Sequence, residues 1–433
     1  MKKILLLSMV LGCGISLQAS EFNENFNDST LRIDYILGGN PEGSYIYLQG
    51  QTKQAGWAGR TSRLKEIPVS GNGDITVIDP VTGDTLYNNC FSTLFQEWIY
   101  TPEAKTASKS FENSFLVPLP KKDADIRLTL RNNRNEVIAS HNHRYRKDDE
   151  LVRDIKHAPL PHKYIHKGGE PGEAIDLAIL AEGYTAEEMD SFLEAAERVS
   201  NDILSYEPFA SNKDKFNIVA VMTPSEESGV SVPLKDEWKD TRYGSHYSTF
   251  YSGRYLTSPR VWRMHQDLEG LPYEWILMLV NTTEYGGGGI FNSYQIAAAN
   301  NELTPVVAVH EFGHSFAGLA DEYNYEDNED QTYVDGVEPW EKNITTLADF
   351  DSKWKSKVSP DTPIPTPWTE QAREESLQLN NSMQTVGAYE GAGYRKTGVY
   401  RPVETCRMRD NYYPEFCVVC EEAIREIIDF YTN

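Results

Sequence analysis

Short stretches that alternate between hydrophobic and polar residues occupy the chain from about residue 21 to residue 145, with turn residues between them. This alternation places every second side chain on one face of a strand. The stretches read LRIDYIL, SYIYLQG, DITVIDP, SFLVPLP, DIRLTLRNN and EVIASHNHRYR. Their spacing predicts an all-β, sandwich-like N-terminal domain over residues 21–145.

The pattern changes after residues 146–172, a charged stretch rich in Pro and Gly that we interpret as a linker. Three mostly apolar runs of strand length follow, AIDLAILAEG, FNIVAVMTP and EWILMLVN. After the first run, Thr185 and Glu188 have the spacing of a capping box, and apolar residues then recur at helical spacing. Strands that alternate with helices predict an α/β domain with a mostly parallel, twisted sheet over residues 173–433, so the whole chain is α+β.

The first residues have the pattern of an export signal. Two lysines precede an apolar run, and the small residue Ala19 stands before Ser20. The run is shorter than the roughly 20 residues that span a bilayer, and no later stretch qualifies, so we interpret residues 1–19 as a signal peptide and expect no transmembrane segment. We expect the protein in the periplasm, in the extracellular space or, if a lipid is attached to Cys13 of VLGC, on the cell surface.

Composition and charge narrow the classes of partner. The chain has 433 residues, of which 39% are hydrophobic and 24% charged, as is typical of a folded globular protein. Its formal net charge is −24. Nucleic acids and anionic membrane surfaces need basic patches, so this charge argues against both as partners. The oligomeric state does not follow from the sequence.

Cysteines are few, and three of them stand together near the C-terminus, at Cys406, Cys417 and Cys420. In an exported protein, such a group favours a disulfide over a metal site. A zinc site would also need a fourth ligand, and none stands nearby in the sequence. We therefore expect a disulfide, and its pairing remains open.

The stretch HEFGHSFAGLADEY, residues 310–323, predicts a metal site on a helix. Thr304 as cap, a proline next to it and Gly318 as stop delimit a short helix. His310 and His314 are four residues apart and share one face of that helix. Zinc lowers the pKa of a bound water to about 7, and Glu311 beside the first histidine can accept its proton as the oxygen attacks a carbonyl carbon.

A catalytic zinc needs a third protein ligand and an open position. Metzincin-type proteases carry that ligand three residues after a glycine. The interval from Gly318 to Asp321 preserves this spacing, with one extra residue after His314, so we predict Asp321 as third ligand. Glu322 or a more distant glutamate are the competing assignments.

Downstream residues offer two further features of a metzincin-like site, a methionine beneath the metal and a tyrosine near the oxyanion. Met408 lies in a turn-like stretch, where it would form the floor beneath the metal. Tyr412 or Tyr413 could direct a phenol toward the developing oxyanion, although either residue could equally pack in the core.

The glycine-rich segment before the helix predicts the wall of a cleft. In YGGGGIFNSYQIAAAN we expect an edge strand that pairs with an extended substrate, with Gly288, Gly289, Ile290 and Phe291 at the cleft. A phosphate-binding loop is disfavoured because the run lacks a GK[ST] ending.

Acidic residues cluster in the loop after the metal-site stretch. Asp327, Asn328 and Asp330 offer the hard oxygen ligands that Ca²⁺ prefers, and a solvated acidic loop is the alternative.

At the metal-site stretch, and in GAGYRKTGVYRP and CRMRDNYYPEFCVVC, the sequence resembles the bacterial IgA-peptidase family of metalloendopeptidases. The resemblance runs from about Ala174 to the C-terminus. It implies a secreted, zinc-dependent endopeptidase with an N-terminal β domain, with His310, Glu311 and His314 in the roles given above. It also implies Asp321 as the third ligand.

Our leading hypothesis is a secreted zinc endopeptidase that hydrolyses extracellular proteins or peptides, immunoglobulins among the candidate substrates. Membership of a family does not fix the substrate, because specificity depends on the binding site of each member. Two alternatives remain. One is an exported surface binding module with a structural zinc site and no hydrolytic activity, and the other is a metal-dependent hydrolase of non-peptide amides or esters.

Overall fold

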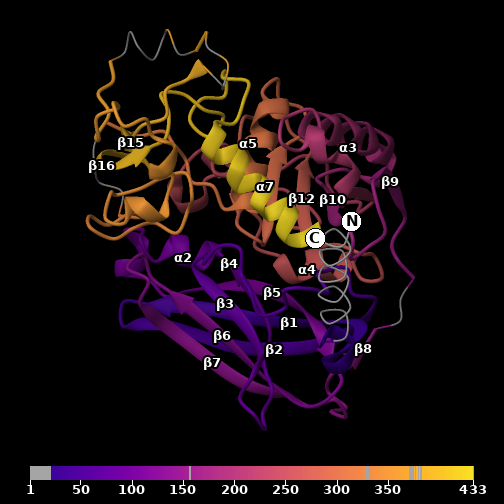
Figure 1. Ribbon diagram of the computed structural model, residues 1–433. Coiled ribbons are helices and arrows are strands. Elements are labelled where there is room, and N and C mark those ends of the chain that lie inside the picture. Colours follow the sequence, from indigo (N-terminus) through magenta and orange to yellow (C-terminus); the bar gives the residue numbers. More distant parts are fainter. Residues whose placement is uncertain are drawn as a thin grey trace, which may run out of the picture.

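The structure is a computed structural model, and it describes residues 21–155, 158–326, 331–369, 375, 377–378, 380 and 383–432. The proposed signal peptide with Cys13 and the candidate calcium ligands Asp327, Asn328 and Asp330 lie outside the described residues. The fold is α+β with several sheets, as the sequence predicts. It forms an N-terminal unit of strands and a second unit built on a six-stranded sheet (Figure 1).

Two four-stranded sheets make up the N-terminal unit, with strand orders β5-β1-β2-β8 and β4-β3-β6-β7. Alternate residues of the strands point inward, so Leu31, Ile33 and Tyr35 of β1 have no exposed surface. Both sheets contribute to one hydrophobic core. The bounds are β1 Phe26–Asn40, β2 Gly43–Ala55, β3 Gly73–Ile78, β4 Thr85–Phe91, β5 Lys109–Pro120, β6 Ala124–Arg131, β7 Val137–Tyr145 and β8 Arg153–Asp154.

The second unit contains a six-stranded sheet of order β13-β14-β12-β10-β11-β9. Its four central strands run parallel to one another, and the strand at each edge is antiparallel to its neighbour. The bounds are β9 His162–Lys167, β10 Ile175–Glu182, β11 Phe216–Val221, β12 Trp275–Val280, β13 Gly287–Ile290 and β14 Tyr294–Ala298. A separate hairpin joins β15 (Tyr389–Ala392) and β16 (Arg395–Arg401).

Helices cover the sheet because its central strands are apolar on both faces. The odd-numbered residues of β10 pack in one core with α3 (Met189–Ile203), α5 (Thr304–Ala317) and α7 (Val418–Thr432). The even-numbered residues face a second core that includes α4 (Val261–Asp267). The short helix α2 (Leu94–Trp98) belongs to the N-terminal unit. None of the described helices is long and apolar enough to cross a membrane.

Two local expectations need correction. The stretch 146–172 is not only a linker, because it contains β8 and β9, and β9 forms the edge of the six-stranded sheet through main-chain bonds to β11. Main-chain pairing stabilises an edge strand even when its side chains are polar, which the hydrophobic pattern does not detect. Thr304 does not cap α5 either. Leu303 holds the cap position, and the Thr304 hydroxyl donates to Ala298 O at 2.7 Å.

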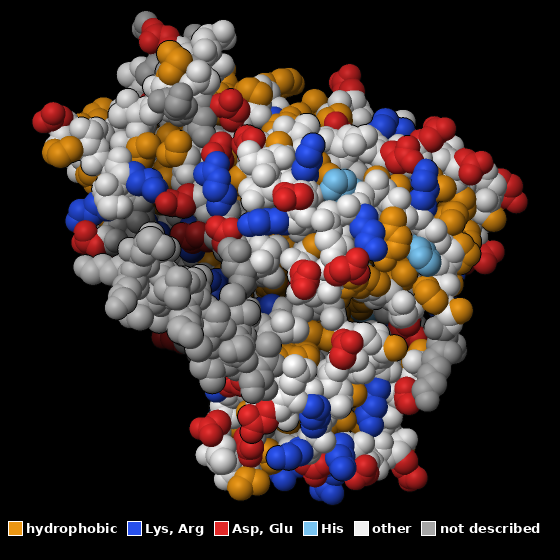
Figure 2. Space-filling view, turned by 45° about the vertical axis from the view of Figure 1, so that its right-hand side comes forward, with side chains coloured by type: hydrophobic (Ala, Val, Ile, Leu, Met, Phe, Trp, Pro, Cys, Tyr) orange, Lys and Arg blue, Asp and Glu red, His pale blue; other side chains and the backbone are white. Residues whose placement is uncertain are grey.

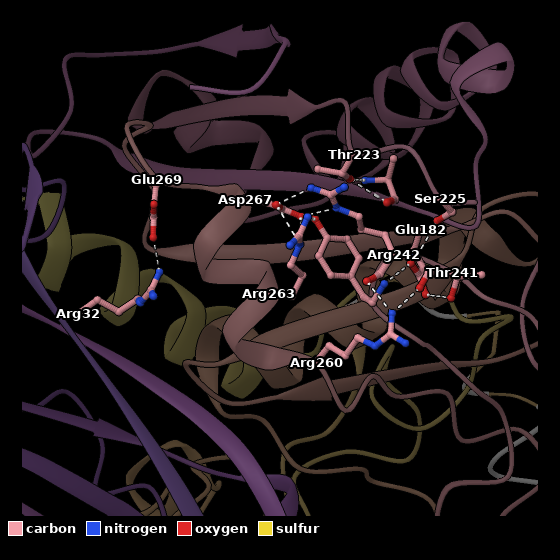
Figure 3. A network of polar contacts seen from close by, with 12 residues as sticks. Arg32, Glu182, Thr223, Ser225, Thr241, Arg242, Arg260, Arg263, Asp267 and Glu269 are labelled. Atoms are coloured by element: carbon pink, nitrogen blue, oxygen red, sulfur yellow. Dashed lines mark hydrogen bonds and ion pairs between the residues drawn. The ribbon is translucent and has the colours of Figure 1, made fainter. Parts of the chain in front are cut away.

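Ion pairs hold the loops of the second unit, and a buried one joins it to the first (Figure 3). Arg242 donates two hydrogen bonds of 2.7 Å to Asp267 of α4. Arg32 of β1 is fully buried and donates to Glu269, just after α4, at 2.8 Å. Between the units, therefore, a charge pair lies out of contact with water. By contrast, acidic and basic side chains are interspersed on the outer face drawn in Figure 2.

Replacement of Arg32 by methionine should destabilise the full chain by about 3–5 kcal/mol, because it leaves the Glu269 carboxylate buried without its cation. Lys163→Met is the control. It breaks the Lys163–Glu197 pair, whose side chains are 51% and 46% exposed, and should cost less than about 1 kcal/mol. Urea unfolding followed by fluorescence measures both. Equal midpoints for the two variants would contradict this account of the contact.

Candidate metal centre

Helix α5 and the turn that follows it bring three ligand atoms together. His310 Nε2 and His314 Nε2 lie 3.0 Å apart. Asp321 Oδ1 lies 2.9 Å from the first nitrogen and 3.3 Å from the second. Gly318 makes this convergence possible, because it ends α5 in the left-handed conformation at φ 62° and turns the chain back toward the histidines.

The second nitrogen of each imidazole is engaged by a backbone carbonyl. His310 Nδ1 donates to Arg407 O at 3.0 Å, and His314 Nδ1 donates to Leu319 O at 2.5 Å. A carbonyl only accepts, so Nδ1 carries the proton in both rings and the Nε2 lone pairs face each other. Two lone pairs and a carboxylate oxygen at this separation repel one another, and a cation between them removes the repulsion.

The separations fit a small divalent metal ion. A tetrahedral zinc ion with metal–nitrogen bonds of about 2.0–2.1 Å keeps its ligand atoms about 3.3 Å apart. The three observed separations run from 2.9 to 3.3 Å. Two imidazoles and one carboxylate provide three protein ligands and leave a fourth position open, as in catalytic sites.

Without a metal, the same groups hold a proton. Burial disfavours charge on His314, but the adjacent Asp321 carboxylate outweighs burial and raises the pKa of the imidazole to about 9. A metal ion must therefore displace this proton, which makes metal binding at the centre weaker as the pH falls.

Glu311 faces the strand β13 from the neighbouring position on α5. An added Cβ at Gly287 would lie 2.9 Å from Glu311 Oε1, and one at Gly289 would lie 2.5 Å from Glu311 O. Only glycine therefore lets this edge strand approach the helix while Glu311 keeps its place. Burial raises the pKa of Glu311 despite the nearby histidines, which makes this carboxylate a stronger base than an exposed one.

Met408 lies directly beneath the centre. Its side chain is fully buried, and an added Cβ at Gly313 would lie 2.8 Å from Met408 Sδ, so the thioether packs against the helical turn between the two histidines. Met408 O also accepts from Glu322 N at 2.8 Å. The segment around Met408 thus packs beneath the two histidines. It also orients His310 through Arg407 O and holds the turn after α5 through Met408 O.

The sequence did not single out Tyr394, which holds Asp321, the predicted third ligand. Its hydroxyl donates to Asp321 Oδ2, the oxygen that faces away from the histidines, and Gly393 N donates to Asp321 O at 2.9 Å. Both residues lie in the turn of the β15–β16 hairpin. The only signal for them was their place in GAGYRKTGVYRP, one of the stretches that carries the family resemblance.

Glu322, the competing third ligand, points away from the histidines. Its Oε1 accepts from Asn343 Nδ2 at 3.0 Å and from Cys420 Sγ at 3.1 Å. The side chains of these two adjacent residues therefore point to different places, Asp321 toward the histidines and Glu322 toward the C-terminal cysteines.

The centre opens into a cleft of about 860 Å³. Gly288, Gly289, Ile290 and Phe291 line it, together with residues of the N-terminal unit that the sequence did not associate with chemistry, such as Asn72, Glu97 and Tyr100. Tyr255 donates to Glu97 within this cleft. Burial raises the pKa of Glu97 to about 7, although the bond from Tyr255 lowers it.

The structure does not place either candidate oxyanion donor in the cleft. Tyr412 is 83% exposed, and Tyr413 is buried with its hydroxyl against Gln384 Nε2 at 2.9 Å. Neither residue lines the cleft. Tyr413 packs in the core instead, which was the alternative considered for it.

Two family models match the chain. The model described as IgA Peptidase M64 matches residues 164–381 and 369–428, and the model described as Peptidase M64 N-terminus matches residues 21–142. No curated protein matches the chain. The first model covers the metal centre and the sheet behind it, and the second covers most of the N-terminal strands.

Removal of the Tyr394 hydroxyl should weaken metal binding at the centre by about 10–100-fold, because Asp321 loses the bond that orients it. Chelator competition on Tyr394→Phe measures this effect, and a His310→Ala variant identifies the metal that belongs to this centre. Tyr325→Phe is the matched control, since its hydroxyl contacts Arg254 at 3.4 Å and no ligand. An unchanged affinity in Tyr394→Phe would show that Asp321 does not depend on this bond.

Proposed function

Because the chain belongs to the IgA peptidase M64 family, its substrates are proteins or peptides, and we propose that it is a zinc-dependent endopeptidase. The observation that carries the proposal is the convergence of His310 Nε2, His314 Nε2 and Asp321 Oδ1, with Glu311 beside them, at the base of an open cleft. Zinc suits this mixture of imidazole and carboxylate ligands, and it needs the one open position that they leave.

Zinc, when bound, polarises the substrate carbonyl and lowers the pKa of a water to about 7. Glu311 accepts the proton of that water at its carboxylate as the water oxygen attacks the carbonyl carbon. The same carboxylate then delivers the proton to the amide nitrogen that leaves. His310 and His314 each hold a proton at Nδ1 against a carbonyl oxygen, so their Nε2 atoms are the ones that would bind the metal.

The arrangement around the centre supports a metzincin-like zincin site. Three features agree with it: an active-site helix packed on a sheet with parallel central strands, a glycine turn before the third ligand, and a methionine beneath the histidines. The antiparallel strand β13 forms the sheet edge beside α5.

An extended substrate is proposed to bind along β13. Part of this edge is already covered, because Leu256 N donates to Gly287 O at 3.3 Å. The peptide would therefore pair at Gly289, one strand step further on, where the main chain lies against Glu311 and His314. The N-terminal unit contributes Asn72, Glu97 and Tyr100 to the lining of the cleft.

We further propose that the protein acts outside the cytoplasm, in the periplasm, at the cell surface or in the extracellular medium. The support is the basic start, the apolar run and the small residue at position 19. Extracellular proteins, immunoglobulins among them, are then the first substrates to test.

Glu311→Gln should lower kcat/KM for a protein substrate by about 10²–10⁴-fold and leave the metal content unchanged, because the amide keeps the shape of the side chain and cannot accept the proton. Casein and immunoglobulin digests measure the activity. Glu302→Gln, an exposed change just before the same helix, is the control and should cleave normally. Equal cleavage by Glu311→Gln would contradict the mechanism.

Chelation should abolish cleavage, and added zinc should restore it. An exported binding module with a structural metal predicts the opposite pair of results, no hydrolysis of any protein with or without metal and binding that survives the chelator. The same two digests, run with chelator and with zinc restored, therefore distinguish the two functions. Hydrolysis of only ester or non-peptide amide substrates would point to the third hypothesis.

A further inference from the structure

Glu322 and three cysteines form a second cluster of potential metal ligands, which we call the thiol cluster. The ligand atoms of Glu322, Cys406, Cys417 and Cys420 all lie within 4.8 Å of one another, and all four residues are buried. Cys417 immediately precedes α7, and Cys420 lies in the first turn of that helix. Cys406 stands two residues before Met408. The cluster thus joins Glu322, in the turn after α5, to three cysteines of the C-terminal stretch.

We propose that the thiol cluster binds one structural zinc ion through three thiolates and the Glu322 carboxylate. Four protein ligands close a tetrahedral site and leave no position for a water or a substrate. This inference goes beyond the peptidase function and does not depend on it.

The spacing of the sulfur atoms fits a shared metal. Cys406 Sγ and Cys420 Sγ lie 3.7 Å apart. Zinc–sulfur bonds of about 2.3 Å in a tetrahedron separate the sulfurs by about 3.8 Å, whereas a disulfide holds them at about 2.05 Å. All four described cysteines are free thiols in the structure, so the disulfide expected from the sequence is not formed.

Glu322 supplies the independent evidence for a cation. Its side chain is fully buried, and Oε2 has no hydrogen-bond partner in the part of the chain that the structure describes. Asn343 Nδ2 and Cys420 Sγ both donate to Oε1, at 3.0 Å and 3.1 Å, so the carboxylate lies against the sulfurs. A buried carboxylate with an unsatisfied oxygen is costly, and a metal ion satisfies it.

The surroundings can also accommodate the charge. One divalent cation with four anionic ligands leaves two negative charges in the core. Two fully buried arginines lie within electrostatic range of the cluster: Arg401 acts on Glu322, and Arg407 acts on Cys406. The start of α7 adds the positive end of a helix dipole beside Cys417 and Cys420, which favours their thiolates.

A disulfide explains the cluster less completely. It would join two of the three cysteines, leave the third as a thiol, and leave the Glu322 carboxylate buried without a counter-ion. A metal ion uses all four groups at once. It would also tie Glu322, the neighbour of Asp321, to the segment that carries Met408, so the thiol cluster would brace the catalytic centre from below.

Cobalt replaces zinc in such sites and reports its ligands by colour. The full mature chain, produced in cobalt-supplemented medium, should contain about two ions per chain and show the intense near-ultraviolet band of thiolate-to-Co²⁺ charge transfer. The His310→Ala/His314→Ala variant should lose one ion and keep the band. Because the histidine centre contains no thiolate, the band belongs to the thiol cluster alone.

Variants of the cluster itself complete the test. Cys420→Ser should lose the band and one ion and keep the ion at the histidines. Glu322→Gln preserves the shape and the bond from Asn343, so it should fold, keep the band and lose the thiolate-bound ion to a chelator faster than the unaltered chain. Cys90→Ser is the control for a buried cysteine elsewhere and should keep both ions and the band.

Three results would overturn the proposal: cobalt at the histidines without the charge-transfer band, an intact mass lower by two hydrogens that reveals a disulfide, or three freely alkylated thiols in protein saturated with metal. None of these results tests the peptidase proposal, which the Glu311→Gln variant tests separately.

Discussion

Electrostatic repulsion among three close ligand atoms is the constraint that organises the second unit. The Nε2 atoms of His310 and His314 lie 3.0 Å apart with a carboxylate oxygen beside them, and such a group persists in a core only around a cation or a proton. Glycines at several positions around the three atoms make this arrangement possible. Gly318 turns in the left-handed region, Gly313 makes room for Met408, and glycines in β13 let the strand approach Glu311.

The N-terminal unit is part of the same arrangement. It is joined to the second unit by the buried pair between Arg32 and Glu269, and its helix α2 brings Glu97 into the cleft. Asn292 Nδ2 donates to Cys90 O, and Ser92 N donates to Phe291 O, directly beside the end of β13. The position of the edge strand therefore depends on both units. A cleft assembled in this way explains why the N-terminal strands accompany the metal-binding sequence in one chain.

Local patterns in the sequence were sufficient to predict most helices and strands and most residues of the candidate metal centre. The spacing of His310 and His314, the apolar faces of the central strands and the Thr185–Glu188 capping box all act over a few residues, and the structure has the corresponding helices and strands. Asp321 followed from its distance to Gly318, and the structure places it beside the histidines. Contacts between distant segments could not be predicted in this way. Tyr394, 73 positions after Asp321, and Glu97 of the other unit reach the cleft only through tertiary packing.

Glu322 shows the same limit most clearly, because it is next to Asp321 in the sequence and yet its Oε1 accepts from Asn343 and Cys420 in the structure. The most direct test of the metal centre is anomalous scattering at the zinc edge from crystals of the protein. We expect a peak bonded to His310 Nε2, His314 Nε2 and a carboxylate oxygen of Asp321, with metal–nitrogen distances of about 2.0–2.1 Å. A centre without a peak, or a peak that Glu322 completes in place of Asp321, would contradict it.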